Sequence, residues 1–274
     1  MQETTETHPH SWISRHPEVA LWSTFAAVKL IVHLICWHGY GVFRDELYFL
    51  DCGRHLDWGY VDHAPMVGWI AWLSQVTFGD SLFGLRFYPA LAGATKVFLA
   101  GWMAREIGAS RFAQGMTCLS FLIGPVFTAA DSMLTIASIE QLFWMVCTCI
   151  LIYIIKTGTE RAWLAFGAVF GIGLMTKHSF VFFGAATVIA LLLTPHCRYM
   201  LCRSFWIGGL IAALLALPNL LWQIANDWPT LGFMKALNQN SSINPVEFLL
   251  GQVLYHHVIL LPIWFLGLFH FLRT

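Results

Sequence analysis

Residues 41–65 read GVFRDELYFLDCGRHLDWGYVDHAP and form a polar stretch inside an otherwise apolar chain of 274 residues. Five of the fifteen carboxylates of the whole chain lie here, namely Asp45, Glu46, Asp51, Asp57 and Asp62. Basic and aromatic residues are interleaved with them: Arg44, Arg54, His55, His63, Phe43, Tyr48, Phe49, Trp58 and Tyr60. A chain this apolar does not gather so many titratable groups without a function. We therefore interpret this stretch as the working part of the molecule.

The composition of the whole chain is that of a membrane protein. Charged residues make up 11% of it, against about 25% in soluble proteins. Apolar runs of roughly 20 residues recur, which is the length of a helix that crosses a bilayer. We therefore predict an all-α fold, a polytopic bundle of transmembrane helices. The net charge of zero identifies no partner, and we expect membrane lipids rather than nucleic acid around the chain.

About eight apolar segments are expected to span the membrane. They are residues 19–38, 82–104, 112–129, 133–155, 162–175, 180–193, 205–222 and 248–272. Residues 1–18 are then a cytoplasmic tail, and residues 19–274 form one transmembrane domain whose outer loop at 39–81 contains the working part. The fifth and sixth segments are short, so we expect a tight hairpin with Lys177 at its turn, near the membrane surface.

The distribution of Lys and Arg predicts the orientation of the bundle. With the N-terminus inside, the inner side holds Arg15, Arg105, Arg111, Lys156, Arg161, Arg198, Arg203 and Arg273, and the outer side holds Arg44, Arg54, Arg86, Lys177 and Lys235. The acidic residues lean to the outer side. The sequence therefore predicts that the polar stretch faces the extracytoplasmic side, as does a second polar loop at 223–247.

Residues 66–79 are apolar but too short to span a bilayer. Trp69, Trp72, Leu73 and Val76 recur at the spacing of one helix face. This pattern predicts a helix that lies flat at the membrane interface within the first outer loop.

Lys29, Lys96 and Glu140 lie well inside apolar segments, where charges are functional candidates. Lys29 and Glu140 are expected at similar depths, so an ion pair between them is the structural alternative to a functional role. Lys96 lies nearer the inner side, where its amine is expected to extend to the membrane surface.

Asp45 and Glu46 are adjacent, so their side chains diverge by about 100° on a helix and cannot address one substrate atom. We expect one of them to act as a general base, while the other binds a cation or caps the local structure. The alternative is an ordinary solvated loop with acidic residues at the starts of helices.

Four short motifs follow one another along this chain. They are Arg-Asp-Glu-Leu-Tyr at 44–48, Gly-Tyr-Val-Asp-His-Ala-Pro at 59–65, Asp131, and Met-Thr-Lys at 175–177. Together they resemble the motifs of the glycosyltransferase C superfamily, and the closest likeness is to family 39, which contains the protein O-mannosyltransferases and the aminoarabinose transferases. The first resembles the acidic motif of that family, and the second resembles its Gly-Tyr-x-Asp-His-Pro-Pro signature, from which Ala64 departs. Asp131 stands where the family often has Thr-Pro-Asp, and residues 175–177 resemble its Leu-Thr-Lys. The likeness covers nearly the whole chain.

The resemblance implies a multi-pass protein of the bacterial inner membrane that transfers a sugar with inversion. The donor would be a polyprenyl-phosphate sugar, and the acceptor a protein, lipid or glycan outside the cytoplasm. It implies Asp45 as the base, with Glu46, Asp62 or Asp131 orienting the acceptor or binding a divalent metal ion, for which Asp62 is the preferred ligand. Phosphate contacts are expected from Arg54, His63, Arg86 and Lys177, and sugar or acceptor contacts from Tyr48, Trp58, Tyr60 and Asp131.

Simpler roles remain open for several of these residues. His63 is alternatively a hydrogen-bonded loop histidine, Lys177 an anchor at the membrane surface, and Asp131 a helix N-cap. His256 and His257 are expected to form interfacial hydrogen bonds rather than to bind metal. For the chain as a whole, the alternatives are a truncated non-catalytic relative, a subunit of a second membrane protein, or a transporter of lipid-linked sugars.

Overall fold

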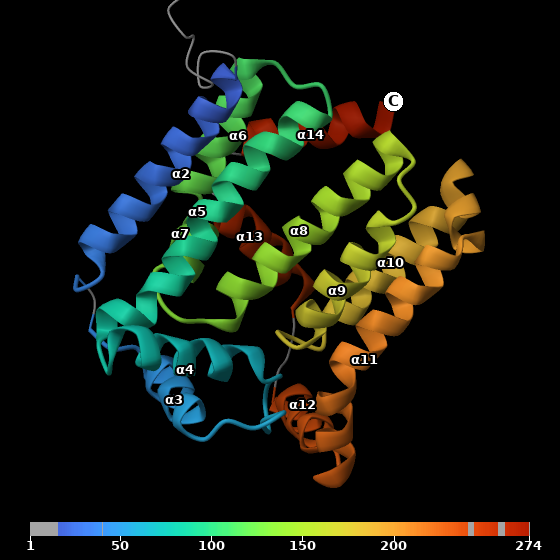
Figure 1. The fold of residues 1–274 in the computed structure, drawn as a ribbon. Helices are drawn as coiled ribbons and strands as arrows, with labels where there is room; N and C mark the ends of the chain where they lie inside the picture. Colours follow the sequence, from blue (N-terminus) through green and yellow to red (C-terminus); the bar gives the residue numbers. More distant parts are fainter. Residues whose placement is uncertain (1–15, 40, 241–243, 257–260, 274) are drawn as a thin grey trace, which may run out of the picture.

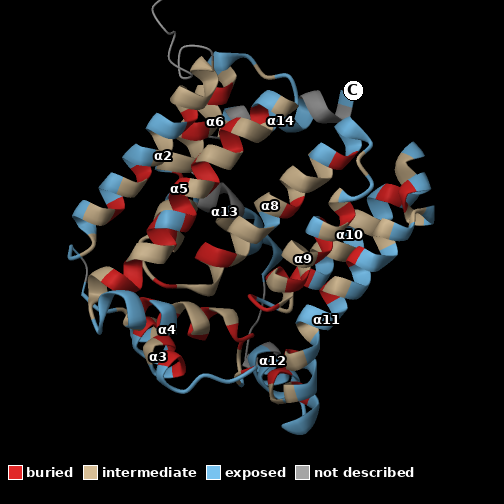
Figure 2. Ribbon diagram, viewed as in Figure 1, coloured by how far each residue is buried: buried red, intermediate tan, exposed pale blue. Residues whose placement is uncertain are grey.

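The computed structural model describes residues 16–39, 41–240, 244–256 and 261–273, and helices are the regular secondary structure throughout these ranges (Figure 1). The predicted all-α fold is therefore confirmed. Four long helices run between the two ends of the bundle, α2 (Pro17–Cys36), α5 (Leu82–Glu106), α8 (Ile136–Thr157) and α11 (Arg203–Ala225). Figure 2 shows buried residues concentrated along α5, which packs against both α2 and α8, while much of α11 is exposed.

Shorter helices complete the bundle. The helices α6 (Arg111–Ile123) and α7 (Pro125–Asp131) meet at an angle of 55°. The break falls at Pro125, which lacks the amide hydrogen that a continuous helix needs. The helices α9 (Ala162–Leu174) and α10 (Phe180–Leu192) flank the predicted turn at Lys177, and a 3₁₀ helix follows at Pro195–Leu201.

Three described helices, α2, α8 and α11, are long and apolar enough to cross a membrane, and the number rises to five if each bent helix pair is one span. These helices support an integral membrane protein. Within the predicted segment at 248–272, the described residues belong to two helices, α13 (Pro245–His256) and α14 (Leu261–Arg273). Residues 257–260, which include His257, lie outside the described residues, so a single span here stays a prediction.

Close contact between α9 and α11 depends on small residues. A Cβ atom added to Gly167 would clash with the carbonyl oxygen of Gly208. The two backbones can therefore lie this close only because neither residue has a side chain. Small residues at such contacts are typical of packed helices in membranes. The hairpin turn that follows α9 lies at the same end of the molecule as the polar stretch (Figure 1).

Three helices lie at this end of the bundle: α3 (Arg44–Arg54), α4 (Met66–Phe78) and α12 (Pro229–Asn240) (Figure 1). The predicted helix at 66–79 is confirmed as α4, with Val67 and Ala71 buried and Trp72 and Val76 exposed. The segment expected to be a polar loop at 223–247 contains α12. The position of α4 at the membrane interface stays a prediction.

Candidate functional site

Asp45 and Glu46 occupy the first turn of α3 and point in different directions. The Asp45 side chain is 44% exposed, and the Nε atom of Arg44 donates to its Oδ1 atom at 3.1 Å. The Glu46 side chain is fully buried. The structure thus separates the two acids as expected for neighbours on a helix, and Asp45 is the one that an acceptor can reach.

Glu46 is the centre of a buried hydrogen-bond network. Its carboxylate accepts two hydrogen bonds from Arg86, from Nε at 2.9 Å and from Nη2 at 2.7 Å. It also accepts from the backbone amides of Phe43 at 3.0 Å and Leu134 at 3.3 Å. Arg86 donates further to the carbonyl groups of Trp37 and Gly41. The network joins α3, α5 and the connection between α7 and α8.

This burial differs from the contacts predicted for the two residues. Glu46 was expected to meet the acceptor or a metal ion, and Arg86 to meet the donor phosphate. In the structure Glu46 is enclosed, and Arg86 is 5% exposed and directed at protein oxygens. Both side chains therefore hold the start of α3, and with it Asp45, in place.

His63 is buried in a cluster of aromatic rings. Its ring lies against those of Tyr48, Phe49 and Tyr60, with centroids 4.8 to 5.5 Å apart. Its Nδ1 atom donates to the carbonyl oxygen of Ala64 at 2.8 Å. Burial lowers the pKa of His63 below its ordinary value, so the imidazole is neutral at pH 7. This arrangement matches the alternative of a hydrogen-bonded loop histidine rather than a phosphate contact.

The residues expected to stack on a sugar differ in their exposure. Trp58 is exposed and packs edge-on against Trp69, with centroids 5.1 Å apart. Tyr48 is also exposed at its ring but donates its hydroxyl to Asp62 at 2.7 Å, and burial together with this bond raises its pKa. Tyr60 donates to the carbonyl oxygen of Cys52 at 2.8 Å, and burial raises its pKa to about 12. Trp58 is therefore the most accessible aromatic platform among them.

Lys177 and Arg54 are the two predicted phosphate contacts that remain at the surface. The Lys177 side chain is 52% exposed and lies 3.5 Å from Glu140. Its turn is held to α4, because the amide of Met66 donates to the carbonyl oxygen of Met175 at 2.9 Å. Arg54 is ion-paired with Asp80 at 3.0 Å. Only an exchange of partners would bring either cation to a phosphate.

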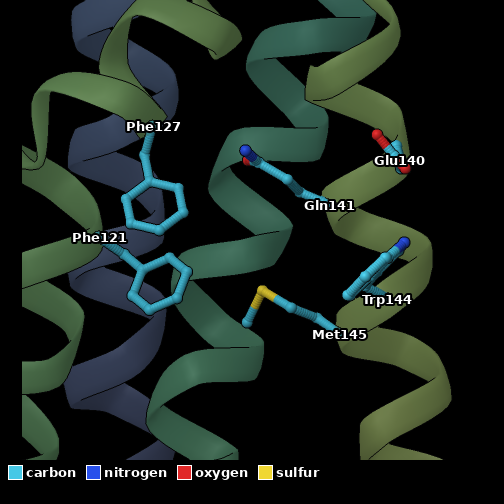
Figure 3. Close-up of a pocket in the computed structure, with 6 residues that line it drawn as sticks. All are labelled: Phe121, Phe127, Glu140, Gln141, Trp144 and Met145. Carbon is cyan, nitrogen blue, oxygen red and sulfur yellow. The ribbon is translucent and has the colours of Figure 1, made fainter. Parts of the chain in front are cut away.

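A cavity of about 320 Å³ lies beside the ion pair of Lys177 and Glu140. Figure 3 shows Gln141 and Met145 extending from α8 towards Phe121 and Phe127. The cavity is lined by Phe121, Phe127, Glu140, Gln141, Trp144 and Met145. It is apolar apart from Glu140 and Gln141, which suits a hydrocarbon chain with a polar end. The sequence carried no signal for it, since its walls come from helices far apart in the chain.

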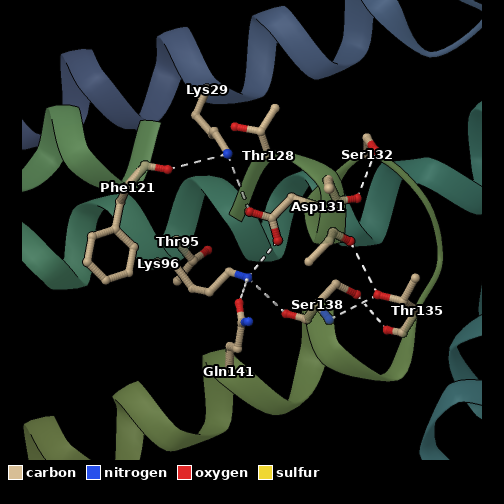
Figure 4. A network of polar contacts seen from close by, with 12 residues as sticks. Lys29, Thr95, Lys96, Phe121, Thr128, Asp131, Ser132, Thr135, Ser138 and Gln141 are labelled. Carbon is tan, nitrogen blue, oxygen red and sulfur yellow. Dashed lines mark hydrogen bonds and ion pairs between the residues drawn. The ribbon is translucent and has the colours of Figure 1, made fainter. Parts of the chain in front are cut away.

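A second polar network is buried inside the bundle (Figure 4). Asp131 accepts from Lys96 at 2.6 Å and lies 3.5 Å from Lys29, and all three side chains are 1% exposed. Lys96 donates in addition to Gln141 at 3.0 Å and to the carbonyl oxygen of Ser138 at 3.3 Å. Lys29 also donates to the carbonyl oxygen of Phe121 at 3.4 Å.

This network corrects three expectations. The pair of Lys29 with Glu140 is wrong, because Lys29 faces Asp131 while Glu140 faces Lys177. Lys96 does not extend to the membrane surface, because Asp131 holds its amine inside the bundle. Asp131 is not the N-cap of α8, which is Thr135, and its burial leaves no direct path to an acceptor.

Within the described ranges, no group of three His, Cys, Asp or Glu side chains is arranged to hold a metal ion. Asp62, the preferred ligand, instead accepts from Tyr48 and lies 3.8 Å from His63. A divalent metal at Asp62 therefore stays a prediction.

The long apolar helices of the bundle support an integral membrane protein. The sequence model of the dolichyl-phosphate-mannose-protein mannosyltransferase family matches residues 62–222, more than half of the chain. The protein belongs to this family. The match begins at Asp62, inside the predicted signature at 59–65, and includes the turn at Lys177, whereas the acidic pair of Asp45 and Glu46 lies before it.

Curated relatives carry related activities in their names. Lipid A galacturonosyltransferase RgtD of Rhizobium johnstonii is 28% identical over 189 residues, which cover 68% of this chain and 39% of the relative. An undecaprenyl phosphate-alpha-4-amino-4-deoxy-L-arabinose arabinosyl transferase of Aeromonas salmonicida is 30% identical over 178 residues, which cover 59% of this chain and 30% of the relative. The chain therefore spans between 30% and 39% of the length of these relatives. No solved structure matches it significantly.

Proposed function

We propose that this protein is a membrane glycosyltransferase that moves a sugar from a polyprenyl-phosphate donor to an acceptor outside the cytoplasm, with inversion at the sugar. The observation that carries the proposal is the division of the acidic pair. Glu46 is enclosed by Arg86 and two backbone amides, whereas its neighbour Asp45 is left half-exposed at the start of α3. Family membership and the names of the relatives support the same reaction class.

In this mechanism Asp45 is the general base. The carboxylate takes the proton of the acceptor hydroxyl as the oxygen attacks the anomeric carbon. The bond from this carbon to the phosphate oxygen breaks on the opposite face, and the polyprenyl phosphate leaves. A positioned base of this kind typically contributes about 10²- to 10⁴-fold in rate.

Lys177 is our preferred contact for the donor phosphate. It is half-exposed, and it sits beside the apolar cavity through its ion pair with Glu140. A phosphate that replaces Glu140 as its partner would leave the first part of the prenyl chain next to Phe121, Phe127 and Trp144. A cation at this place stabilises the leaving phosphate as its charge develops. Arg54 is the second candidate, because its ion pair with Asp80 is exposed.

The remaining expectations belong to the same proposal. We place the end of the bundle that carries α3, α4 and α12 at the extracytoplasmic face of a bacterial inner membrane, with about eight spans and α4 at the interface. Residues 19–274 are then one transmembrane domain with its catalytic loop at 39–81. A lipid acceptor is favoured, because the name of the Rhizobium johnstonii relative specifies lipid A. The proposed partners include a second membrane subunit.

The test is sugar transfer in membranes that contain the full chain, with a radiolabelled polyprenyl-phosphate sugar as the donor. Asp45→Asn is expected to reduce transfer by about 10²-fold or more while donor binding persists. Asp51→Asn is the matched control, because Asp51 is an exposed acid on the same helix and is expected to keep wild-type activity. Equal transfer by Asp45→Asn and wild type would remove Asp45 from the mechanism. Absence of transfer with every donor tried would favour a non-catalytic subunit.

A further inference from the structure

The corner between α11 and α12 has an unusual backbone. Asp227 has φ of 60° and Trp228 has φ of 57°, so two consecutive residues other than glycine adopt the left-handed conformation. This conformation is uncommon for any residue with a side chain and is an outlier for a bulky one. Such strain persists where surrounding contacts enforce it, and it concentrates at ligand sites.

Specific hydrogen bonds enforce the corner. The amide of Trp228 donates to the carbonyl oxygen of Gln223 at 2.8 Å. The Gln223 side chain is buried, and its Nε2 atom donates to the hydroxyl of Thr230 at 2.7 Å. Among the described residues, the Oε1 atom of Gln223 has no hydrogen-bond partner. The base of the corner is therefore rigid and retains one unused acceptor.

The strained backbone shapes a cavity of about 380 Å³ at the surface. It is lined by Asp227, Trp228, Pro229, Leu231, Gly232 and Lys235. Trp228 is 42% exposed although it is a large aromatic residue. The side chains of Asp227 and Lys235 make neither an ion pair nor a hydrogen bond with any other described residue, so both charges are available to a ligand.

This cavity lies at the same end of the molecule as Asp45. The Nδ2 atom of Asn219, on α11, donates to the carbonyl oxygen of Trp58 at 2.7 Å. The hydroxyl of Thr230, on α12, donates to the carbonyl oxygen of Tyr60 at 3.4 Å. Figure 1 shows α12 beside the segment that connects α3 and α4. The corner is thus fixed directly to the polar stretch.

We propose that the corner of α11 and α12 is a carbohydrate-binding subsite that holds a pyranose ring. The apolar C–H face of a pyranose stacks on an exposed indole, which Trp228 supplies. A carboxylate accepts hydrogen bonds from sugar hydroxyls and an ammonium donates to their oxygens, and Asp227 and Lys235 supply these groups. The identification of this sugar as part of the acceptor rests on the proposed glycosyl transfer, whereas the binding of a sugar does not.

The test is binding of chitotriose and maltotriose to the purified full chain, measured by equilibrium dialysis. Trp228→Gly is the decisive variant, because glycine adopts positive φ without strain and only the indole is lost. It is expected to weaken binding of at least one trisaccharide tenfold or more. Asp227→Asn keeps a residue that tolerates this conformation and is expected to weaken binding about threefold. Trp206→Ala removes an exposed indole elsewhere on α11 and is expected to change nothing.

Several results would overturn the subsite. One is wild-type protein that binds neither trisaccharide, and another is unchanged affinity in Trp228→Gly. Displacement of the trisaccharide by inorganic phosphate, abolished by Lys235→Gln, would identify an anion site instead. Sugar transfer assayed on the same preparations separates this inference from the proposed function. Transfer with an unchanged KM for the acceptor in Trp228→Gly rejects the assignment of the bound sugar to the acceptor, whereas saccharide binding that depends on Trp228 without any transfer rejects the transferase alone.

Discussion

Glu46 and Asp131 are both buried carboxylates beside cations, but their networks differ in charge balance. At the end of the bundle, Glu46 faces one arginine, and both of its oxygens accept two hydrogen bonds each. Inside the bundle, Asp131 lies between two lysines. Its Oδ1 atom is 2.6 Å from Lys96, while its Oδ2 atom has only Lys29 at 3.5 Å. The first network is balanced and fully hydrogen-bonded, and the second has one more cation than anion.

The difference indicates that the two networks have different structural roles, although both contact the short connection between α7 and α8. Asp131 ends α7, and three residues later the amide of Leu134 donates to Glu46. The balanced network fixes the start of α3 and therefore the direction of Asp45. The unbalanced network anchors the C-terminal end of α7 between α2 and α5. Removal of single partners from each network tests this comparison.

The largest loss of stability is expected from Arg86→Met. This variant leaves the Glu46 carboxylate buried without its cation, which typically costs about 3–5 kcal/mol in the free energy of unfolding. Reversible unfolding in mixed detergent micelles measures it. Arg54→Met is the matched control, because its ion pair with Asp80 is exposed and is worth at most about 1 kcal/mol. Similar losses in both variants would contradict the importance of the buried pair.

A smaller, unequal effect is expected from the two lysines beside Asp131. Lys96→Met removes a cation with three hydrogen-bonded acceptors and is expected to cost about 3 kcal/mol. Lys29→Met removes the surplus cation, whose contacts are 3.4 and 3.5 Å long, and is expected to cost less than about 1 kcal/mol. The same unfolding measurement ranks them. The reverse order would show that Lys29 is the true partner of Asp131.

The smallest expected effect concerns the pH dependence of the free energy of unfolding, to which His63 contributes. Burial lowers its pKa in the folded protein, so the unfolded chain binds more protons below the ordinary pKa of about 6.5. The contribution of His63 to the free energy of unfolding is therefore fully present above this pH, and it is lost as the pH decreases from about 6.5 towards the lowered pKa. His63→Asn is expected to flatten the slope, measured by unfolding between pH 7 and pH 5. His55→Asn, an exposed histidine in the same stretch, is expected to leave the slope unchanged.

Much of the architecture was predictable from local pattern. The spacing of Trp72 and Val76 predicted both the helix α4 and its exposed face, and the short segments around Lys177 predicted the hairpin. The adjacency of Asp45 and Glu46 predicted that only one of them could serve a substrate atom. Pattern did not predict the helix α12 within a segment expected to be a loop. Apolar content alone does not show where a helix ends.

The sequence by itself determined the class of membrane protein, most helices and the residues of the polar stretch, because these follow from composition and periodicity within a few turns of chain. Only the tertiary structure decided the partners. Lys96 pairs with Asp131, 35 residues away, and Glu46 accepts from Leu134, 88 residues away. Such contacts depend on which helices are neighbours and on their rotation. Because one residue turns a side chain by about 100°, depth in the membrane alone could not distinguish Asp131 from Glu140 as the partner of Lys29.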